Sequence, residues 1–202
     1  MDDCFTILDR QRVLDGFLKL DRYAVRQRRF DGTETPTLHR DILVAAECVG
    51  VLLYDPLRDA VVLVEQARLV PVLMGLGAVQ AEIVAGHIDP GDTPRSAADR
   101  EVREETGCAI LGEPERIAVA LTSPGFNTER LHLYCALVDS TTAAGFYGLA
   151  AEHEDIRVLV LPYGQFVQWQ ADGRITNLFT LTAGLWLALN RDRLISSAAP
   201  PR

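Results

Sequence analysis

The segment spanning residues 86–108 constrains the fold most, because it contains a helix whose two ends can be read from the residues. Thr93 is a good N-cap residue, and Pro94 follows at the first helical position, where a missing N–H is tolerated. Gly107 stands where a left-handed C-terminal cap is wanted. The sequence therefore predicts a helix over Pro94–Thr106, preceded by a polar turn and a glycine.

Three glutamates gather on this predicted helix. Glu101 and Glu105 are four residues apart and so lie on one face, with Glu104 beside them. Like charges at this spacing oppose helix formation by roughly 0.2–0.5 kcal/mol unless something neutralises them. Mg²⁺ would do so, because it prefers oxygen ligands and is usually shared between one or two carboxylates and substrate phosphates. The alternative is a solvated acidic face paired with Arg100 and Arg103.

The spacing of the residues decides between these alternatives. Six positions fit the pattern Gly, five residues, Glu, seven residues, Arg-Glu-apolar-x-Glu-Glu-x-Gly-apolar: Gly86, Arg100, Glu101, Glu104, Glu105 and Gly107. At about 7% usage for each residue, six matches at one start position arise by chance about once in ten million. The segment resembles the signature of the Nudix family. Asp92 stands where the family usually has Glu, which keeps the charge on a shorter arm.

The resemblance to the Nudix family implies an α+β fold, an α/β/α sandwich with a mixed central sheet. It also implies that Glu101, Glu105 and the backbone carbonyl of Ala85 are metal ligands. Arg100 would orient the carboxylates through ion pairing, and Glu104 would be a ligand or a support. The implied cofactor is Mg²⁺, with Mn²⁺ as a possible substitute, and the implied chemistry is attack of activated water on a diphosphate.

A narrower resemblance, to bacterial ADP-ribose pyrophosphatases, covers most of the chain. It is carried by residues 16–21, 61–68, 123–125, 128–130 and 148–158, and Pro124 is the feature associated with that subfamily. In the resembling enzymes the last of these loops swings over the substrate. The resemblance implies that Glu152 is the general base and Glu154 a metal ligand, whereas the alternative is a mobile acidic surface loop.

The same resemblance implies a set of substrate-binding residues: Phe17, Leu18, Arg40, Asp41, Arg68, His87, Ser123, Pro124, Gly125 and Glu129. Arginine forks can meet phosphate or stack on a base, although each of Arg40 and Arg68 could instead be a surface arginine at a strand end. The expected reaction is hydrolysis of ADP-ribose to AMP and ribose 5-phosphate. GDP-mannose or ADP-glucose is an alternative substrate. A non-catalytic nucleotide-binding regulator is a further alternative, against which the complete acidic set argues.

We expect one main domain in this 202-residue chain. Residues 1–40 are predicted as an N-terminal β-region that contributes to a dimer and to the substrate site, 41–195 as the hydrolase domain and 196–202 as a flexible tail. In the resembling enzymes the N-terminal strands exchange across a two-fold dimer, in which Arg40 and Glu129 would serve the neighbour's site. We therefore expect a homodimer that acts on a small nucleoside diphosphate sugar.

Residue patterns predict the order of the elements along the chain. A β-meander is expected at 13–30, and further strands at 42–53, 60–66, 82–85, 118–121, 131–138 and 156–161. Loops are expected at 70–79, 123–130 and 141–155, and C-terminal helices at 163–171 and 176–189. Strands dominate the middle of the chain with helices interspersed irregularly, which favours an α+β fold.

Composition excludes several classes of partner. The net charge of −8 disfavours nucleic acid and anionic membrane surfaces as partners. No run approaches the roughly 20 apolar residues that a membrane-spanning helix needs. The four cysteines show no paired spacing, and the start of the chain does not resemble a signal peptide. We expect a cytoplasmic protein with reduced thiols.

Overall fold

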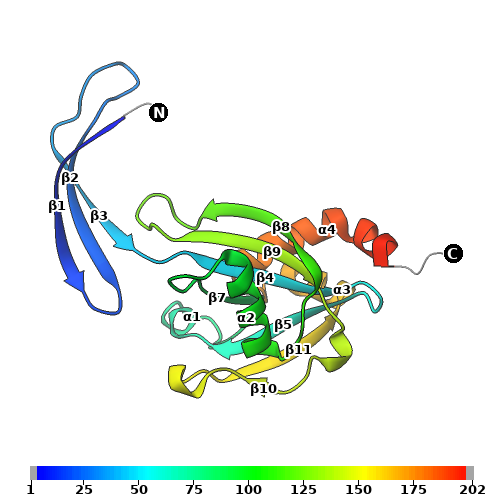
Figure 1. Cartoon of the computed structure of the whole chain (residues 1–202). Helices are drawn as coiled ribbons and strands as arrows, with labels where there is room; N and C mark the ends of the chain where they lie inside the picture. The colour runs from blue at the N-terminus through cyan, green and yellow to red at the C-terminus, as the bar shows by residue number, and fades with distance from the viewer. Residues whose placement is uncertain (1–3, 199–202) are drawn as a thin grey trace. The chain divides into compact units, whose positions relative to one another are not determined.

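The protein is represented by a computed structural model, which describes residues 4–198 apart from the side chain of Glu152. Its chain divides into two compact units (Figure 1). Unit 1 comprises Met1–Glu47 and Ala120–Leu131, and unit 2 comprises Cys48–Val119 and His132–Arg202. The segment 120–131 therefore belongs with the N-terminal strands although residues 48–119 separate the two in the sequence.

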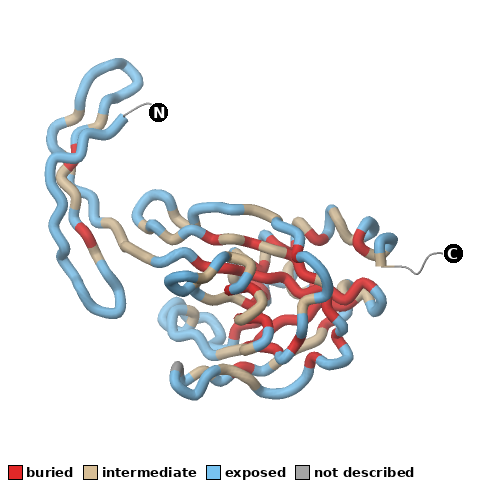
Figure 2. The backbone as a smooth tube through the Cα atoms, viewed as in Figure 1, coloured by how far each residue is buried: buried red, intermediate tan, exposed pale blue. Residues whose placement is uncertain are grey.

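Unit 1 is built on an antiparallel sheet in the order β1 (Phe5–Asp15), β2 (Lys19–Gln27), β3 (Leu38–Val44). The expected meander is present, but its first strand begins at Phe5 rather than near residue 13. The segment 120–131 joins the end of β3, where Leu43 N donates to Phe126 O at 2.7 Å and Thr128 N donates to Leu43 O at 3.0 Å. β1 is exposed along its whole length (Figure 2).

Unit 2 contains most of a sheet in the order β10-β11-β5-β4-β9-β8, with β6 beside β5 and β7 beside β4; the last two residues of β8 and the first two of β9 are assigned to unit 1. The strands are β4 (Cys48–Asp55), β5 (Ala60–Ala67), β6 (Val79–Glu82), β7 (Val84–His87), β8 (Leu111–Leu121), β9 (Arg130–Leu137), β10 (Phe146–Tyr147) and β11 (Ile156–Pro162). The helices are α1 (Leu69–Leu73), α2 (Pro94–Thr106), α3 (Tyr163–Ala171) and α4 (Leu178–Ala198), with the 3-10 helices η1 (Ser140–Thr142) and η2 (Ala150–Glu152).

The two central strands of this sheet are covered on both faces. Every residue of β4 is buried, and alternate residues Val49, Val51 and Leu53 pack in one core cluster with Ala98 and Val102 of α2. Figure 1 shows α2 in front of the sheet and α3 and α4 behind it, and α4 contacts β4. The α/β/α sandwich with a mixed central sheet, expected from the sequence, is confirmed.

The helix α2 has the predicted bounds at both ends. Thr93 Oγ1 accepts a hydrogen bond from Ser96 N at 3.0 Å, and Ser96 Oγ accepts one from Thr93 N at 2.9 Å. These two bonds form a capping box that satisfies donors at the helix start. Gly107 closes the helix in a left-handed conformation with φ 67°, which a glycine adopts without strain.

The central strands β4 and β5 are paired with each other over only part of their length. They pair only from Leu53 opposite Val62 to Asp55 opposite Ala60. Further along, β4 pairs with β7 and β5 pairs with β6. The strand expected at 82–85 is therefore two strands, which divide at Ile83. Ile83 N donates to Thr180 Oγ1 of α4 at 3.0 Å, and this bond coincides with the change of partner strand.

Other expected boundaries were wrong because contacts distant in sequence set them. The strand expected at 42–53 is interrupted after Val44, where β3 of unit 1 ends and β4 of unit 2 begins at Cys48. The loop expected at 70–79 contains α1, and the loop expected at 141–155 contains η1, β10 and η2. The last helix, expected at 176–189, runs to Ala198 and so includes residues 196–198 of the expected tail, whereas 199–202 lie outside the described residues.

Among residues 4–198, no helix combines the length and apolar character needed to cross a membrane.

Candidate active site

The acidic face of α2 points into unit 2 rather than into solvent. Glu101 is 9% exposed and Glu105 is 3% exposed. Glu105 Oε2 accepts a hydrogen bond from Ala85 N of β7 at 3.3 Å. A Cβ added at Gly86 would overlap the Glu101 carboxylate, so only glycine leaves room for that side chain against β7. The two acids thus lie between the helix and the backbone of β7.

Arg100 ties the loop before α2 to these acids. Its Nη2 donates to the backbone carbonyl of His87 at 2.9 Å, and its Nη1 donates to Glu104 Oε2 at 3.1 Å. The same Nη1 lies 2.8 Å from Glu101 Oε1. Weaker ion pairs at 3.5–3.6 Å reach Asp89 and Asp92. One guanidinium therefore holds the helix and the loop in a fixed relation.

The two buried acids are poorly compensated. Burial raises the pKa of Glu101 to about 7 against the pull of Arg100, and repulsion from Glu104 and Glu154 adds to the increase. Burial raises the pKa of Glu105 to about 8, with further repulsion from Glu101 and Glu154. The ionised forms of Glu101 and Glu105 are therefore unfavourable unless a cation binds beside them.

Glu154 belongs to the same group of charges although it comes from the loop before β11. Its Oε2 accepts a hydrogen bond from Leu149 N at 3.2 Å, and Gly148 N donates to the carbonyl of Glu104 at 3.4 Å. A Cβ on Gly148 would come within 2.7 Å of the Glu154 Cβ, and its φ of 104° also favours glycine. Glu152 ends η2, but its side chain lies outside the described residues.

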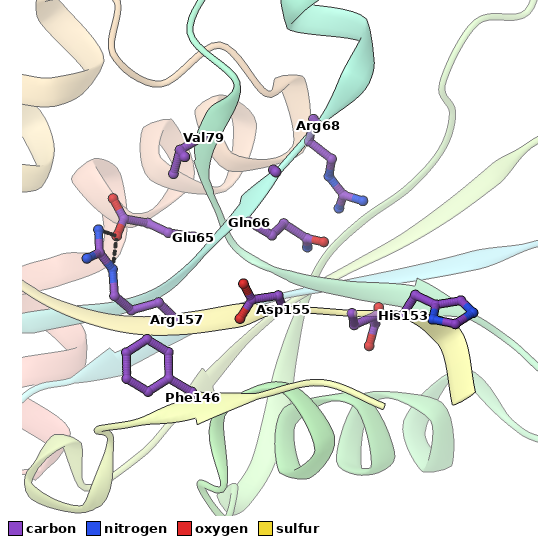
Figure 3. A pocket seen from close by; sticks show the side chains of 10 residues that line it. Glu65, Gln66, Arg68, Val79, Phe146, His153, Asp155 and Arg157 are labelled. Carbon is purple, nitrogen blue, oxygen red and sulfur yellow. Dashed lines mark hydrogen bonds and ion pairs between the residues drawn. The ribbon is translucent and has the colours of Figure 1, made fainter. Parts of the chain in front are cut away.

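A pocket of about 590 Å³ opens next to Glu154 (Figure 3). Arg68, at the end of β5, lines one side of it, and the ion pair between Arg157 and Glu65 lines another. Asp155 also lines it, and Figure 3 shows this residue between the ion pair and the side of the pocket formed by Arg68 and His153. The volume suits a small ligand, and the mixture of arginines and acids suits one that carries both phosphate and hydroxyl groups.

The donor set of the buried acids fits a divalent cation. Carboxylate and backbone oxygens are the ligands that Mg²⁺ uses, and a cation would remove the repulsion that raises the pKa of Glu101 and Glu105. Within the described side chains, no three Asp, Glu, His or Cys residues form a group that could hold a metal alone. A cation here would therefore also be coordinated by water, backbone oxygen or substrate, as is usual for Mg²⁺ in proteins.

Eight of the ten expected substrate-binding residues lie in unit 1. Phe17 and Leu18 are exposed at the β1–β2 turn, and Arg40 is exposed on β3. Asp41 is engaged with Arg22 in two hydrogen bonds of 2.7 Å. The others are in the segment 120–131: Ser123, Pro124, Gly125 and Glu129. The other two expected substrate-binding residues, Arg68 and His87, lie in unit 2. Unit 2 also brings together the expected metal-binding and catalytic residues whose side chains or backbone are described: Ala85, Arg100, Glu101, Glu104, Glu105 and Glu154.

Two residues near the site were missed from the sequence, Glu82 and Asn177. Glu82 is 7% exposed and accepts hydrogen bonds from Arg68 and Asn177. The sequence offered one signal: Glu82 is a charged residue directly before the apolar residues Ile83 and Val84, which precede Ala85, the expected backbone ligand of the metal. No spacing rule connects it to residue 177, which is 95 positions away.

Comparisons with known proteins show the family to which the chain belongs. The ADP-ribose pyrophosphatase of Escherichia coli (strain K12) is 37% identical over 188 residues, 93% of this chain and 90% of that protein. The GDP-mannose pyrophosphatase of Pectobacterium atrosepticum is 30% identical over 87% of this chain and 89% of that protein. A crystal structure of an ADP compounds hydrolase shares the fold, with a TM-score of 0.69 at 18% identity over 96% of both chains. The NUDIX domain model matches residues 45–179, and the chain belongs to this family.

Proposed function

We propose that this Nudix hydrolase cleaves the diphosphate of ADP-ribose to give AMP and ribose 5-phosphate, and that it requires Mg²⁺ or, as a substitute, Mn²⁺. The observation that carries the proposal is the pair of buried, poorly compensated carboxylates beside a pocket lined by Arg68. Relatives named ADP-ribose pyrophosphatase, at 34–37% identity over more than nine-tenths of the chain, support the choice of substrate.

Glu101, Glu105, Glu154 and the backbone carbonyl of Ala85 would contribute ligands to the metal, and water or substrate oxygens would complete its coordination. When bound, it supplies neutralisation of the diphosphate charge and activation of water. Arg100 keeps the carboxylates in place, since it contacts both Glu101 and Glu104. Glu104 serves as a ligand or as a support for the others.

We assign the general base to Glu152. A base that accepts a proton from the attacking water contributes about a hundredfold to ten-thousandfold in rate. Glu152→Gln is expected to lower kcat by at least about a hundredfold and to leave ADP-ribose binding nearly intact, as measured by calorimetry with the inactive protein. A strong loss of binding in this variant would instead indicate a role in holding the substrate or metal.

The proposed substrate contacts in unit 2 are Arg68, which lines the pocket, and His87. Those in unit 1 are Phe17, Leu18, Arg40, Asp41, Ser123, Pro124, Gly125 and Glu129. We propose that residues 1–40 take part in a two-fold homodimer, that 41–195 form the hydrolase domain, and that the protein acts in the cytoplasm. Exposed apolar side chains along β1, among them Ile7 and Leu14, support the dimer. Light scattering coupled to size exclusion tests it, and a monomer at micromolar concentration would contradict it.

The decisive experiment is an assay of purified protein with ADP-ribose and Mg²⁺, with the products identified by chromatography. We expect AMP and ribose 5-phosphate, with catalytic efficiency for ADP-ribose above that for GDP-mannose and ADP-glucose. A higher efficiency with GDP-mannose would support the second candidate, which the relatives named GDP-mannose pyrophosphatase favour. Binding without turnover of any of these substrates would indicate a nucleotide-binding regulator.

A further inference from the structure

The guanidinium of Arg68 is held from one side only. Its Nε and Nη2 both donate to a single oxygen, Oε2 of Glu82, at 3.0 and 2.8 Å. Glu82 lies on β6, which pairs with β5. Within the described residues no hydrogen-bond partner accepts from Nη1 of Arg68. One nitrogen of the fork thus remains available for a ligand.

Glu82 is in turn fixed from behind. Its other oxygen, Oε1, accepts a hydrogen bond from Asn177 Nδ2 at 3.1 Å. Asn177 precedes α4, and its Oδ1 accepts from Thr180 N at 3.1 Å, which is the arrangement of an N-cap. Both oxygens of Glu82 are therefore engaged, and one of them is anchored to the start of a long helix. A charged side chain that is 9% exposed and bonded in this way has little freedom to rotate.

Arg68 faces the charges of the site. It lines the same pocket as Glu154, and its positive charge lowers the pKa of Glu105, against the larger effects of burial and of Glu101. An arginine with two donors anchored presents the remaining one in a set direction, which lowers the entropy lost when an anion binds. A free surface arginine would have to order its whole side chain first.

We propose that Glu82, supported by Asn177, is a positioning residue that directs Arg68 toward the anionic diphosphate of the substrate. The inference rests on the proposed diphosphate hydrolysis. Glu82 and Asn177 do not touch the substrate and act only through Arg68. Their effect is therefore on substrate binding and is lost when Arg68 is absent.

Glu82→Gln is the direct test, because it keeps the size of the side chain and removes the charge that holds the guanidinium. We expect KM for ADP-ribose to rise about tenfold, with kcat changed less than about threefold. In an Arg68→Ala background, the same substitution is expected to leave KM unchanged, since coupled residues are not additive. Equal increases of KM in both backgrounds would overturn the proposal and assign Glu82 a purely structural role.

The chain offers a matched control in Asp59. This carboxylate also accepts two hydrogen bonds from one arginine, Arg191, and a third from Tyr54 at 2.7 Å. It lies in the turn at the opposite end of β4 and β5. Asp59→Asn is expected to lower the melting temperature without changing KM. A rise in KM for this variant equal to that for Glu82→Gln would show that lost stability alone explains both.

A milder variant covers the case in which Glu82→Gln does not fold. Asn177→Ala removes one hydrogen bond to Glu82 and is expected to raise KM about threefold, again only when Arg68 is present. An unchanged KM in folded Asn177→Ala protein, with wild-type hydrolysis intact, would in that case overturn this inference alone. Failure of the wild-type protein to hydrolyse any nucleoside diphosphate sugar would instead remove the proposed function, and this inference with it.

Discussion

Buried acids lie at both ends of the central strands β4 and β5, and they differ in the number of hydrogen bonds they accept and in the direction in which their pKa is shifted. At the turn that joins the strands, Asp55 is 1% exposed and accepts five hydrogen bonds. Burial alone raises its pKa, but donors from Ser140 and Arg58 lower it to about 2. On α2, at the other end, Glu105 is 3% exposed and accepts one bond, from Ala85 N, and burial raises its pKa to about 8.

We infer that the difference separates an acid that stabilises the fold from acids that are proposed to bind a metal. A buried carboxylate with a full set of hydrogen-bond donors is stabilised in its ionised form and contributes to the stability of the fold. A buried carboxylate with too few donors contributes little to folding and retains affinity for a cation that arrives later. Because Asp55 and Glu105 are both buried within unit 2, burial alone does not explain the contrast. The number of donors supplied to each acid explains it.

The largest expected effect is that of Glu105→Gln. The variant keeps the shape of the side chain and removes the charge that would hold a metal. Losing about 4 kcal/mol of transition-state stabilisation corresponds to a decrease of about a thousandfold in kcat at saturating Mg²⁺. We expect the melting temperature in EDTA to stay at or above the wild-type value, since no set of hydrogen bonds is lost. Near-normal turnover would remove the proposed metal face.

Gly86→Ala is expected to have the next largest effect. The added Cβ would occupy the place of the Glu101 carboxylate and displace it. Disturbance of a ligand's position typically costs about tenfold to a hundredfold in metal affinity. The measurement is the Mg²⁺ concentration that gives half-maximal rate. Gly164→Ala is the control, because a Cβ there meets nothing within 4 Å and the residue lies in α3; an equal shift in both variants would contradict the explanation.

Asp55→Asn is expected to show the opposite pattern at the other end of the sheet. The amide cannot accept the bonds of Ser140 and Arg58 together, so buried donors are left unpaired. The free energy of unfolding should fall by about 2 kcal/mol, measured by urea denaturation. The value of kcat/KM per folded molecule should not change. A loss of activity without a loss of stability would break the comparison between the two ends.

The smallest expected effect is the acid dependence of that same stabilisation. The pKa of Asp55 in the folded protein is about 2, below its ordinary value of 3.8. The contribution is therefore complete above about pH 4 and is lost as the pH falls toward 2. Wild-type and Asp55→Asn proteins should thus converge in stability between pH 4 and pH 2. A constant difference across this range would show that the charge of Asp55 is not what stabilises the turn.

The sequence predicted the parts of the molecule that depend on neighbouring residues. The helix α2, its caps and the common face of Glu101 and Glu105 all follow from local spacing, and the structure agrees with each. The family signature extended this to the sandwich fold. The resemblance implied that Arg100 pairs with the carboxylates, and Arg100 lies against Glu101 and Glu104. Its bond to the backbone carbonyl of His87 was not expected.

Features that depend on distant contacts could not be predicted in this way. The donors to Asp55 include Ser140, which is 85 residues away, and the division of β6 from β7 coincides with a bond to Thr180 that spans 97 residues. The buried role of Glu82 depends on Asn177 in the same manner. Local patterns carry no record of such pairings, so a single sequence leaves them open.

The parting of β4 and β5 gives the sheet the form of a Y, with β7 and β6 lying along its two arms. Ala85 and Gly86, which meet the acids of α2, are on one arm, and Glu82 is on the other. Thr180 bonds to Ile83 at the joint between the arms. The first turn of α4, on the back of the sandwich, is thus hydrogen-bonded to the residue from which both arms diverge, so a change at Thr180 is expected to shift the proposed metal ligands and Glu82 together.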